Sequence, residues 1–188
     1  ALYATCQKYS LRLFIDGARL GYGLVSAACD YDLPFLAKHC DVFYIGGTKV
    51  GAMMGEAVVF SGMKAPKYFF TNVKRHGALL AKGRMLGIQF DTLFTDELYF
   101  KISRHAIAMA TRIRSIFEKH GIAIAYDSPT NQQFVVLSPA LYEALSQKVA
   151  FEIWERKSEH EIICRFVTSW ATKEEELNEL DRILQAYA

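Results

Sequence analysis

Several features that mark specialised classes of protein are missing from this sequence of 188 residues. It has four cysteines and no CxxC pair among them: Cys6, Cys29, Cys40 and Cys164. Such spacing favours reduced thiols in a cytoplasmic protein over a disulfide or zinc framework. No apolar run approaches the length of a membrane span, and the first residues lack the layout of a signal peptide. We therefore predict a cytoplasmic protein with no metal site and no membrane partner.

An excess of charge of one sign is also absent. The 22 basic and 20 acidic residues leave a net charge of +2 and are scattered along the chain. Without a basic face or arm, nucleic-acid binding is not predicted. Hydrophobic residues make up 52% of the sequence and aromatic residues 13%, enough for a sizeable core in one domain or two small ones. The chain starts without methionine and inside a helical pattern, so we expect a fragment whose upstream half is missing.

Two short apolar runs are each followed by a polar residue. Leu11–Ile15 and Asp41–Ile45 are typical of buried parallel strands; Asp16 follows the first, and GGTK, ending in Lys49, follows the second. Ligands gather at the carboxyl ends of such strands, so both side chains are predicted to face one crevice. A lysine behind glycines is suited to holding a carbonyl cofactor as a Schiff base. The aspartate would then keep a pyridine nitrogen protonated and make the ring an electron sink.

Each of these residues also has an ordinary structural interpretation. Asp-Gly is a common turn pair, so Asp16 alone is equally a turn residue. GGTK lacks the GxxxxGK[ST] spacing, so Lys49 is not predicted to belong to a nucleotide phosphate loop. Arg165 stands in the apolar run Ile162–Val167 and needs either a structural carboxylate partner or a substrate carboxylate; we favour the substrate.

The remaining pattern predicts an α/β part followed by a smaller α+β part. A third apolar run covers Glu56–Phe60, and a helical region from Lys74 to His120 is either broken near Gly87 to Thr95 or connects two lobes. We place the division between domains at 1–95 and 96–188, with the long helix joining them. Further expected elements are a helix capped by Asp32, strands at 122–126, 134–137, 149–154 and 162–167, a helix from Pro139, and a last helix with a Thr172–Glu175 capping box.

Four stretches together carry a family resemblance: FIDGARLGYG, DVFYIGGTKVGAMMGEAVVF, RHGALLAKGRMLGIQF and CRFVTSWAT. They resemble the low-specificity threonine aldolases of the β-eliminating lyase family, which are fold-type-I pyridoxal-phosphate enzymes. The resemblance covers essentially the whole chain but only the second half of a family member. It implies an α/β fold: part of a transferase-like large domain with a mainly parallel sheet, plus a small α+β C-terminal domain.

The resemblance also implies roles for individual residues. Lys49 would bind pyridoxal 5'-phosphate as a Schiff base, and Asp16 would pair with the ring nitrogen. Thr48 would hydrogen-bond near the cofactor. Arg19 and Arg165 would bind the substrate carboxylate or support the cofactor near it. The family has an arginine in the glycine-rich segment before the long helix. At the corresponding place this chain has the sequence AKGR, so either Lys82 or Arg84 would contact the cofactor. The alternative interpretation is that both residues belong to a solvent-exposed helix face.

The activity implied is cleavage of threonine, allo-threonine or a related 3-hydroxy amino acid to glycine and an aldehyde, in a homodimer or homotetramer. The base for the hydroxyl, the ring-stacking group and most of the phosphate loop are expected upstream, so the 188-residue piece alone should be inactive. One alternative is a β-eliminating lyase or aminotransferase on the same scaffold. The other is a non-catalytic fragment or pseudoenzyme that serves as an interaction module.

Overall fold

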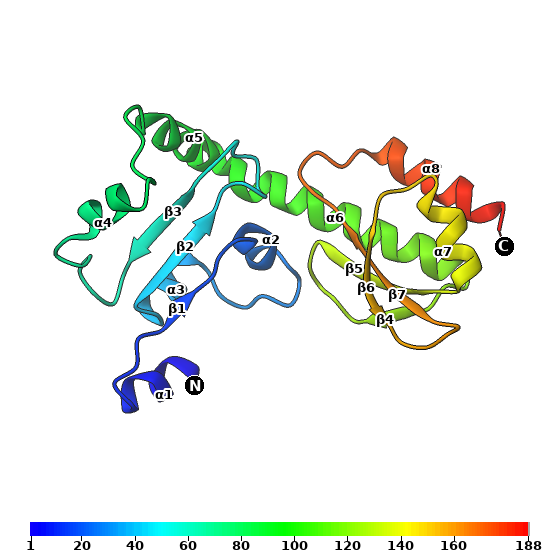
Figure 1. The fold of residues 1–188 in the computed structure, drawn as a ribbon, viewed down its shortest axis with the longest axis horizontal. Helices are drawn as coiled ribbons and strands as arrows, with labels where there is room; N and C mark the ends of the chain where they lie inside the picture. The colour runs from blue at the N-terminus through cyan, green and yellow to red at the C-terminus, as the bar shows by residue number, and fades with distance from the viewer. Residues whose placement is uncertain (188) are drawn as a thin grey trace. The chain divides into compact units, whose positions relative to one another are not determined.

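The computed structural model describes residues 1–187, which form two compact units. The first unit comprises residues 1–24 and 29–101, and the second comprises residues 25–28 and those from 102 onward. Helix α6 (Leu98–Lys119) begins in the first unit and continues into the second (Figure 1). The predicted helical region is broken just before α6, where Asp96 has a φ of 49°. We keep the division between residues 95 and 96 as our proposal for the domains, because this kink lies there.

The first unit contains a three-stranded sheet with helices before and after its strands (Figure 1). The strand order is β1-β2-β3; β1 and β2 are parallel, and β3 is antiparallel to β2, so this sheet is mixed. The elements are α1 (Leu2–Lys8), β1 (Phe14–Ile15), α2 (Leu20–Leu24), α3 (Leu33–Lys38), β2 (Val42–Gly46), β3 (Glu56–Phe60), α4 (Phe69–Arg75), α5 (Arg84–Phe94) and the 3-10 turn η1 (Thr95–Glu97).

The first strand is shorter and more exposed than the sequence predicts. Only Phe14 and Ile15 pair with β2, and Leu11 and Phe14 are 59% and 58% exposed. The prediction of a buried strand over Leu11–Ile15 is therefore wrong. The reason is that β1 is an edge strand, and no other strand within residues 1–187 pairs with its outer side. The central strand β2 lies where an apolar strand was expected, and its Phe43 is buried.

A buried carboxylate ties the start of β1 to β2. Asp41 is 1% exposed; its Oδ2 accepts a hydrogen bond from the Leu13 amide at 2.8 Å, and its Oδ1 accepts one from Arg12 at 3.0 Å. The Leu13 amide and then the Arg12 guanidinium hold the pKa of Asp41 below its usual value. The Asp41 amide in turn donates to the Leu13 carbonyl at 3.0 Å. These bonds help to set the parallel register of the two strands.

The second unit is an antiparallel sheet with helices packed against it (Figure 1). The strand order is β4-β5-β7-β6. Its elements, besides most of α6, are β4 (Ile124–Tyr126), β5 (Gln132–Leu137), α7 (Pro139–Ser146), β6 (Glu152–Arg156), β7 (Ile162–Val167) and α8 (Glu174–Gln185). The strand expected at 149–154 begins instead at Glu152, because Val149 and Phe151 pack against the core as part of the connection from α7.

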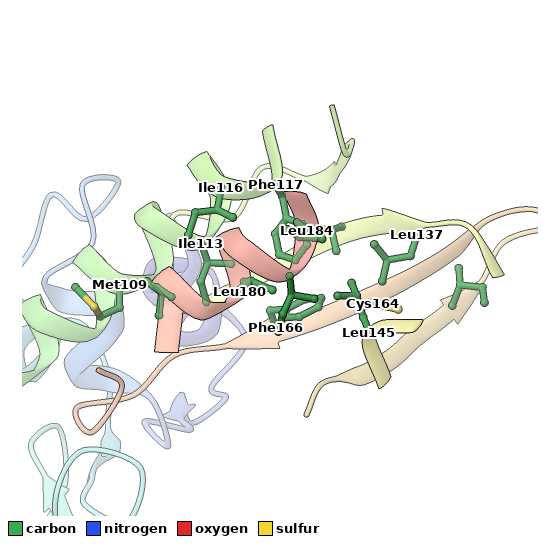
Figure 2. Close-up of a cluster of buried hydrophobic side chains, with 14 residues drawn as sticks. Met109, Ile113, Ile116, Phe117, Leu137, Leu145, Cys164, Phe166, Leu180 and Leu184 are labelled. Atoms are coloured by element: carbon green, nitrogen blue, oxygen red, sulfur yellow. The ribbon is translucent and has the colours of Figure 1, made fainter. Parts of the chain in front are cut away.

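The core of the second unit is apolar and rich in aromatic rings. Phe117 of α6 and Leu180 and Leu184 of α8 belong to the same buried cluster as Phe166 of β7, as Figure 2 shows. The ring of Phe166 lies 4.8 Å from that of Phe117 and stacks on Phe151 at 4.6 Å. The apolar residues of α6 and α8 both repeat with the helical period, so each helix turns one apolar face to this cluster.

Two of the predicted helix starts are confirmed by their capping bonds. The Asp32 carboxylate accepts a hydrogen bond from the Phe35 amide at 2.8 Å at the start of α3. The Ser138 hydroxyl accepts one from the Leu141 amide at 3.3 Å at the start of α7. These side chains satisfy amides that would otherwise have no partner in the first turn.

The predicted capping box of the last helix is wrong by one position. The Glu176 carboxylate, not that of Glu175, accepts from the N-cap amide, which belongs to Lys173, at 3.0 Å. Thr172 Oγ1 instead accepts a hydrogen bond from the Ser169 amide at 2.9 Å. The Thr172 hydroxyl closes the turn before α8, so the helix begins one residue later.

Replacing Phe166 with alanine should lower the free energy of unfolding by about 3–5 kcal/mol, because a large buried ring is lost and a cavity remains. Urea unfolding followed by circular dichroism measures the change. Val167→Ala is the matched control, because this neighbour on β7 is 46% exposed and its truncation should cost less than about 0.5 kcal/mol. Equal losses for the two variants would contradict the core position of Phe166.

Candidate active site

The ends of β1 and β2 bring two of the predicted site residues to one edge of the sheet. Because the two strands are parallel, their carboxyl ends lie at the same edge. Asp16 follows β1 directly, and the GGTK segment with Lys49 begins at the last residue of β2. The positive charge of Lys49 is near enough to Asp16 to lower the pKa of its carboxyl group.

The Asp16 carboxylate is ionised, and only one of its two oxygens accepts hydrogen bonds from the described residues. It is exposed, and its Oδ1 accepts hydrogen bonds from the Tyr44 hydroxyl and from the Ala18 amide, the latter at 3.0 Å. The Tyr44 bond is the main cause of the lowered pKa of Asp16, followed by the Ala18 amide and then the charge of Lys49. Among residues 1–187, Oδ2 receives no hydrogen bond. One oxygen of a negative carboxylate is therefore open to an external donor.

The glycine after Asp16 allows two chain segments to cross at very short range. A Cβ on Gly17 would lie 1.7 Å from the Tyr44 carbonyl oxygen, a separation that no side chain could tolerate. A Cβ on Gly46 would lie 2.5 Å from the Gly17 carbonyl oxygen, which accepts a hydrogen bond from the Gly46 amide at 2.9 Å. This crossing holds Asp16 next to the end of β2, and only glycine fits at positions 17 and 46.

A second carboxylate holds the segment that carries the lysine. Glu56 begins β3 opposite Gly46, and its Oε2 accepts a hydrogen bond from the Gly47 amide at 2.9 Å. Its Oε1 accepts one from Thr48 Oγ1 at 3.1 Å. The Thr48 hydroxyl proton is thus directed to Glu56.

Two buried tyrosines complete the support of this segment. The Tyr22 hydroxyl donates to the Lys49 carbonyl, and the Tyr99 hydroxyl donates to the Gly46 carbonyl at 3.0 Å. Tyr99 also accepts a hydrogen bond from the Gly21 amide at 3.0 Å. Both tyrosines are at most 1% exposed, and burial raises the pKa of Tyr99. The main chain around Lys49 is fixed, whereas its side chain is exposed and its ammonium group has no partner among residues 1–187.

Three other cationic residues predicted to belong to the site, Arg19, Lys82 and Arg84, form no ion pair with any of residues 1–187. Arg19 is half-buried just before α2, and its guanidinium makes no ion pair within residues 1–187. Lys82 and Arg84 are both exposed, with Arg84 as the first residue of α5, and neither side chain forms an ion pair with any other residue of that range. No carboxylate within these residues competes with a ligand for these three groups.

Arg165 belongs to the second unit and has partners of its own. Its Nη2 forms an ion pair with Glu152, its Nη1 donates to Gln132 Oε1 at 3.0 Å, and its guanidinium lies 5.2 Å from the Trp154 ring centre. Its Nε is buried without a hydrogen-bond partner among the described residues. A structural carboxylate, one of the two alternatives for this arginine, is therefore present. Its role toward a substrate stays a prediction.

Sequence reasoning missed the four residues that hold the site together: Tyr22, Tyr44, Glu56 and Tyr99. The available signals were weak. Glu56 is a polar residue at the start of an apolar run, and Tyr44 alternates with buried Phe43 and Ile45 along β2. Tyr99 is distant in sequence from the strand ends, and nothing in the local pattern separates it from an ordinary core aromatic.

No protein-family profile matches the chain. The low specificity L-threonine aldolase of Pseudomonas sp. (strain NCIMB 10558) is 28% identical over 187 residues, 99% of this chain and 53% of that protein. The enzyme of the same name from Pseudomonas aeruginosa is also 28% identical, over 97% of this chain and 52% of its own length. The chain thus spans about half the length of the curated relatives it matches.

Solved structures agree with these relatives. A threonine aldolase from Leishmania major superposes with a TM-score of 0.95 at 36% identity, covering 99% of this chain and 54% of that one. A serine palmitoyltransferase from Sphingomonas wittichii, at 13% identity over 98% of this chain and 49% of its own, has a TM-score of 0.68 and shows the fold alone. The resemblance to low-specificity threonine aldolases is therefore confirmed, and so is the fold-type-I class.

Replacing Gly17 with alanine should destabilise the protein by about 1–3 kcal/mol or more, because the crossing with β2 must open to admit a methyl group. The shift of the thermal unfolding midpoint measures this. Gly23→Ala is the matched control: Gly23 lies in α2, six residues further along the chain, and a Cβ there meets nothing within 4 Å. An unchanged midpoint for Gly17→Ala would show that the two segments do not cross this closely.

Proposed function

We propose that the full-length protein is a pyridoxal-phosphate-dependent aldolase that cleaves threonine, allo-threonine or a related 3-hydroxy amino acid to glycine and an aldehyde. The observation that carries the proposal is the placement of Asp16, ionised with one open oxygen, at the same sheet edge as Lys49 with its unpartnered ammonium group. The names of the relatives support this substrate class.

The residues at this edge fit pyridoxal 5'-phosphate. Asp16 Oδ2 can accept the N–H of a protonated pyridine ring, and Lys49 can bind the carbonyl carbon covalently. When bound, the cofactor supplies an electron sink for the pair released as the Cα–Cβ bond breaks. Thr48 lies beside the lysine, held by Glu56. For Thr48 to donate to the cofactor, its hydroxyl must turn away from that carboxylate.

The cations are proposed to bind the anionic groups. Within the described part of the chain, the Arg19 guanidinium makes no ion pair, and its planar fork suits the substrate carboxylate. We retain Arg165 as a second carboxylate-binding residue; its unpartnered Nε supports this, whereas Glu152 would have to be displaced from its Nη2. Lys82 and Arg84 are proposed as alternatives for a contact to the cofactor phosphate, since both are exposed and unpaired.

The proposal extends to location and assembly. Within residues 1–187, none of the helices is both long and apolar enough to cross a membrane. The free thiols of Cys40 and Cys164 are consistent with the cytoplasm. We propose a homodimer or homotetramer for the full-length protein, as the family resemblance implies.

Reaction products separate the aldolase from its rivals on the same scaffold. With threonine and pyridoxal phosphate, the full-length protein should yield equal amounts of glycine and acetaldehyde, quantified by amino-acid analysis and a coupled alcohol dehydrogenase assay. Pyruvate and ammonia from a β-substituted amino acid, or amino transfer to a keto acid, would identify a β-eliminating lyase or an aminotransferase instead. A protein that binds no cofactor would be a non-catalytic interaction module.

Lys49→Ala should abolish the visible absorption band of the lysine-bound cofactor and with it the activity, because Lys49 is the lysine that follows β2 at this sheet edge and whose charge acts on Asp16. Absorbance spectra of the reconstituted full-length protein measure this. Lys64→Ala is the control, since Lys64 is also exposed but lies beyond β3. Retention of the band in Lys49→Ala would overturn the assignment. The 188-residue piece by itself should bind the cofactor weakly and show no turnover.

A further inference from the structure

We propose that Tyr44 is a positioning residue for the cofactor: its hydroxyl occupies Oδ1 of Asp16, leaves Oδ2 to receive the ring N–H, and keeps the proton on the ring. This inference rests on the proposed function, because it concerns the same site. Tyr44 lies within the DVFYIGGTK stretch, but the family resemblance assigned it no role.

The position of Tyr44 is set by the sheet. It lies on the central strand β2, opposite Val58 of β3. Its ring packs against Phe14 of β1, with ring centres 6.0 Å apart. Its carbonyl oxygen lies at the close crossing with Gly17. Main chain and ring are therefore both restrained, and the hydroxyl meets Asp16 from a defined direction.

Two donors on one carboxylate oxygen have an electrostatic consequence. The Tyr44 hydroxyl and the Ala18 amide both stabilise the negative charge of Asp16, and its pKa is lowered accordingly. A less basic carboxylate draws the proton of a bound pyridinium less strongly, so the proton remains on the ring nitrogen. The ring then keeps the positive charge that makes it an electron sink.

The tyrosine itself is suited to this role. The hydrogen bond to Asp16 is the first cause that raises the pKa of Tyr44 to about 12, with further contributions from burial and from the negative charges of Asp16 and Glu56. The phenol therefore keeps its proton at neutral pH and acts as a donor. A residue that only packed against Phe14 would not need a hydroxyl, so phenylalanine at this position isolates the contribution of the hydrogen bond.

The test uses the full-length protein loaded with pyridoxal phosphate labelled with ¹⁵N in the ring. In Tyr44→Phe, the ring ¹⁵N resonance should move toward that of neutral pyridine, and the dissociation constant of the cofactor should rise about tenfold, the size expected for a lost hydrogen bond to a charged group. Tyr126→Phe is the matched control, because its hydroxyl donates to the Glu155 carboxylate at 3.1 Å in the second unit. That variant should match the wild type in both measurements.

A second variant guards against misfolding of the first. Tyr44→Leu also removes the donor, and whichever variant keeps the wild-type circular dichroism spectrum decides the outcome. Wild-type values of both the ¹⁵N shift and the dissociation constant in that variant would overturn the role of Tyr44 and leave the proposed function standing. If the wild-type protein binds no pyridoxal phosphate, the proposed function and this inference both fail.

Discussion

The parallel pairing of β1 with β2 is the constraint on which the candidate site depends. Buried Asp41 ties the two strands at their start, and the Gly17 crossing locks them at their end. Only two residues of β1 pair with β2, so these end contacts carry much of the alignment. Because both strands run in one direction, the residues that follow them, Asp16 and Lys49, emerge at one edge. An antiparallel pairing would send them to opposite ends of the sheet.

The charges at this edge are arranged around hydrogen bonds to the main chain and to tyrosines. Asp16 stays exposed, so its negative charge avoids the cost of burial, while Tyr44 and the Ala18 amide orient it. Glu56 fixes the loop before Lys49 through the Gly47 amide and the Thr48 hydroxyl. Among residues 1–187, the lysine ammonium group has no hydrogen bond or ion pair. Rigid main chain with a free reactive group is the arrangement that covalent cofactor binding requires.

The second unit is built on a different principle, since apolar packing organises it. The ring of Phe166 contacts those of Phe117 and Phe151. Leu180 and Leu184 of α8 belong to the same cluster as Phe166 and Phe117 (Figure 2). Arg165 alternates with this apolar face along β7, where its Nη2 pairs with Glu152 and its Nη1 donates to Gln132. Because successive side chains of a strand point to opposite faces of the sheet, Arg165 points away from the core that its neighbour Phe166 enters.

By itself, the sequence determined the elements whose signals are local. Ser138 and Asp32 bind amides three residues away, and the apolar residues of α8 repeat with the helical period. The placement of Asp16 and Lys49 after two neighbouring parallel strands was predicted from two short motifs. Tertiary structure alone decided that β1 lies exposed at an edge, that Arg165 has a carboxylate partner, and that Tyr44, Glu56 and Tyr99 support the site. These depend on which strands become neighbours. Residues far apart in the chain meet only through that pairing, so no local pattern can encode it.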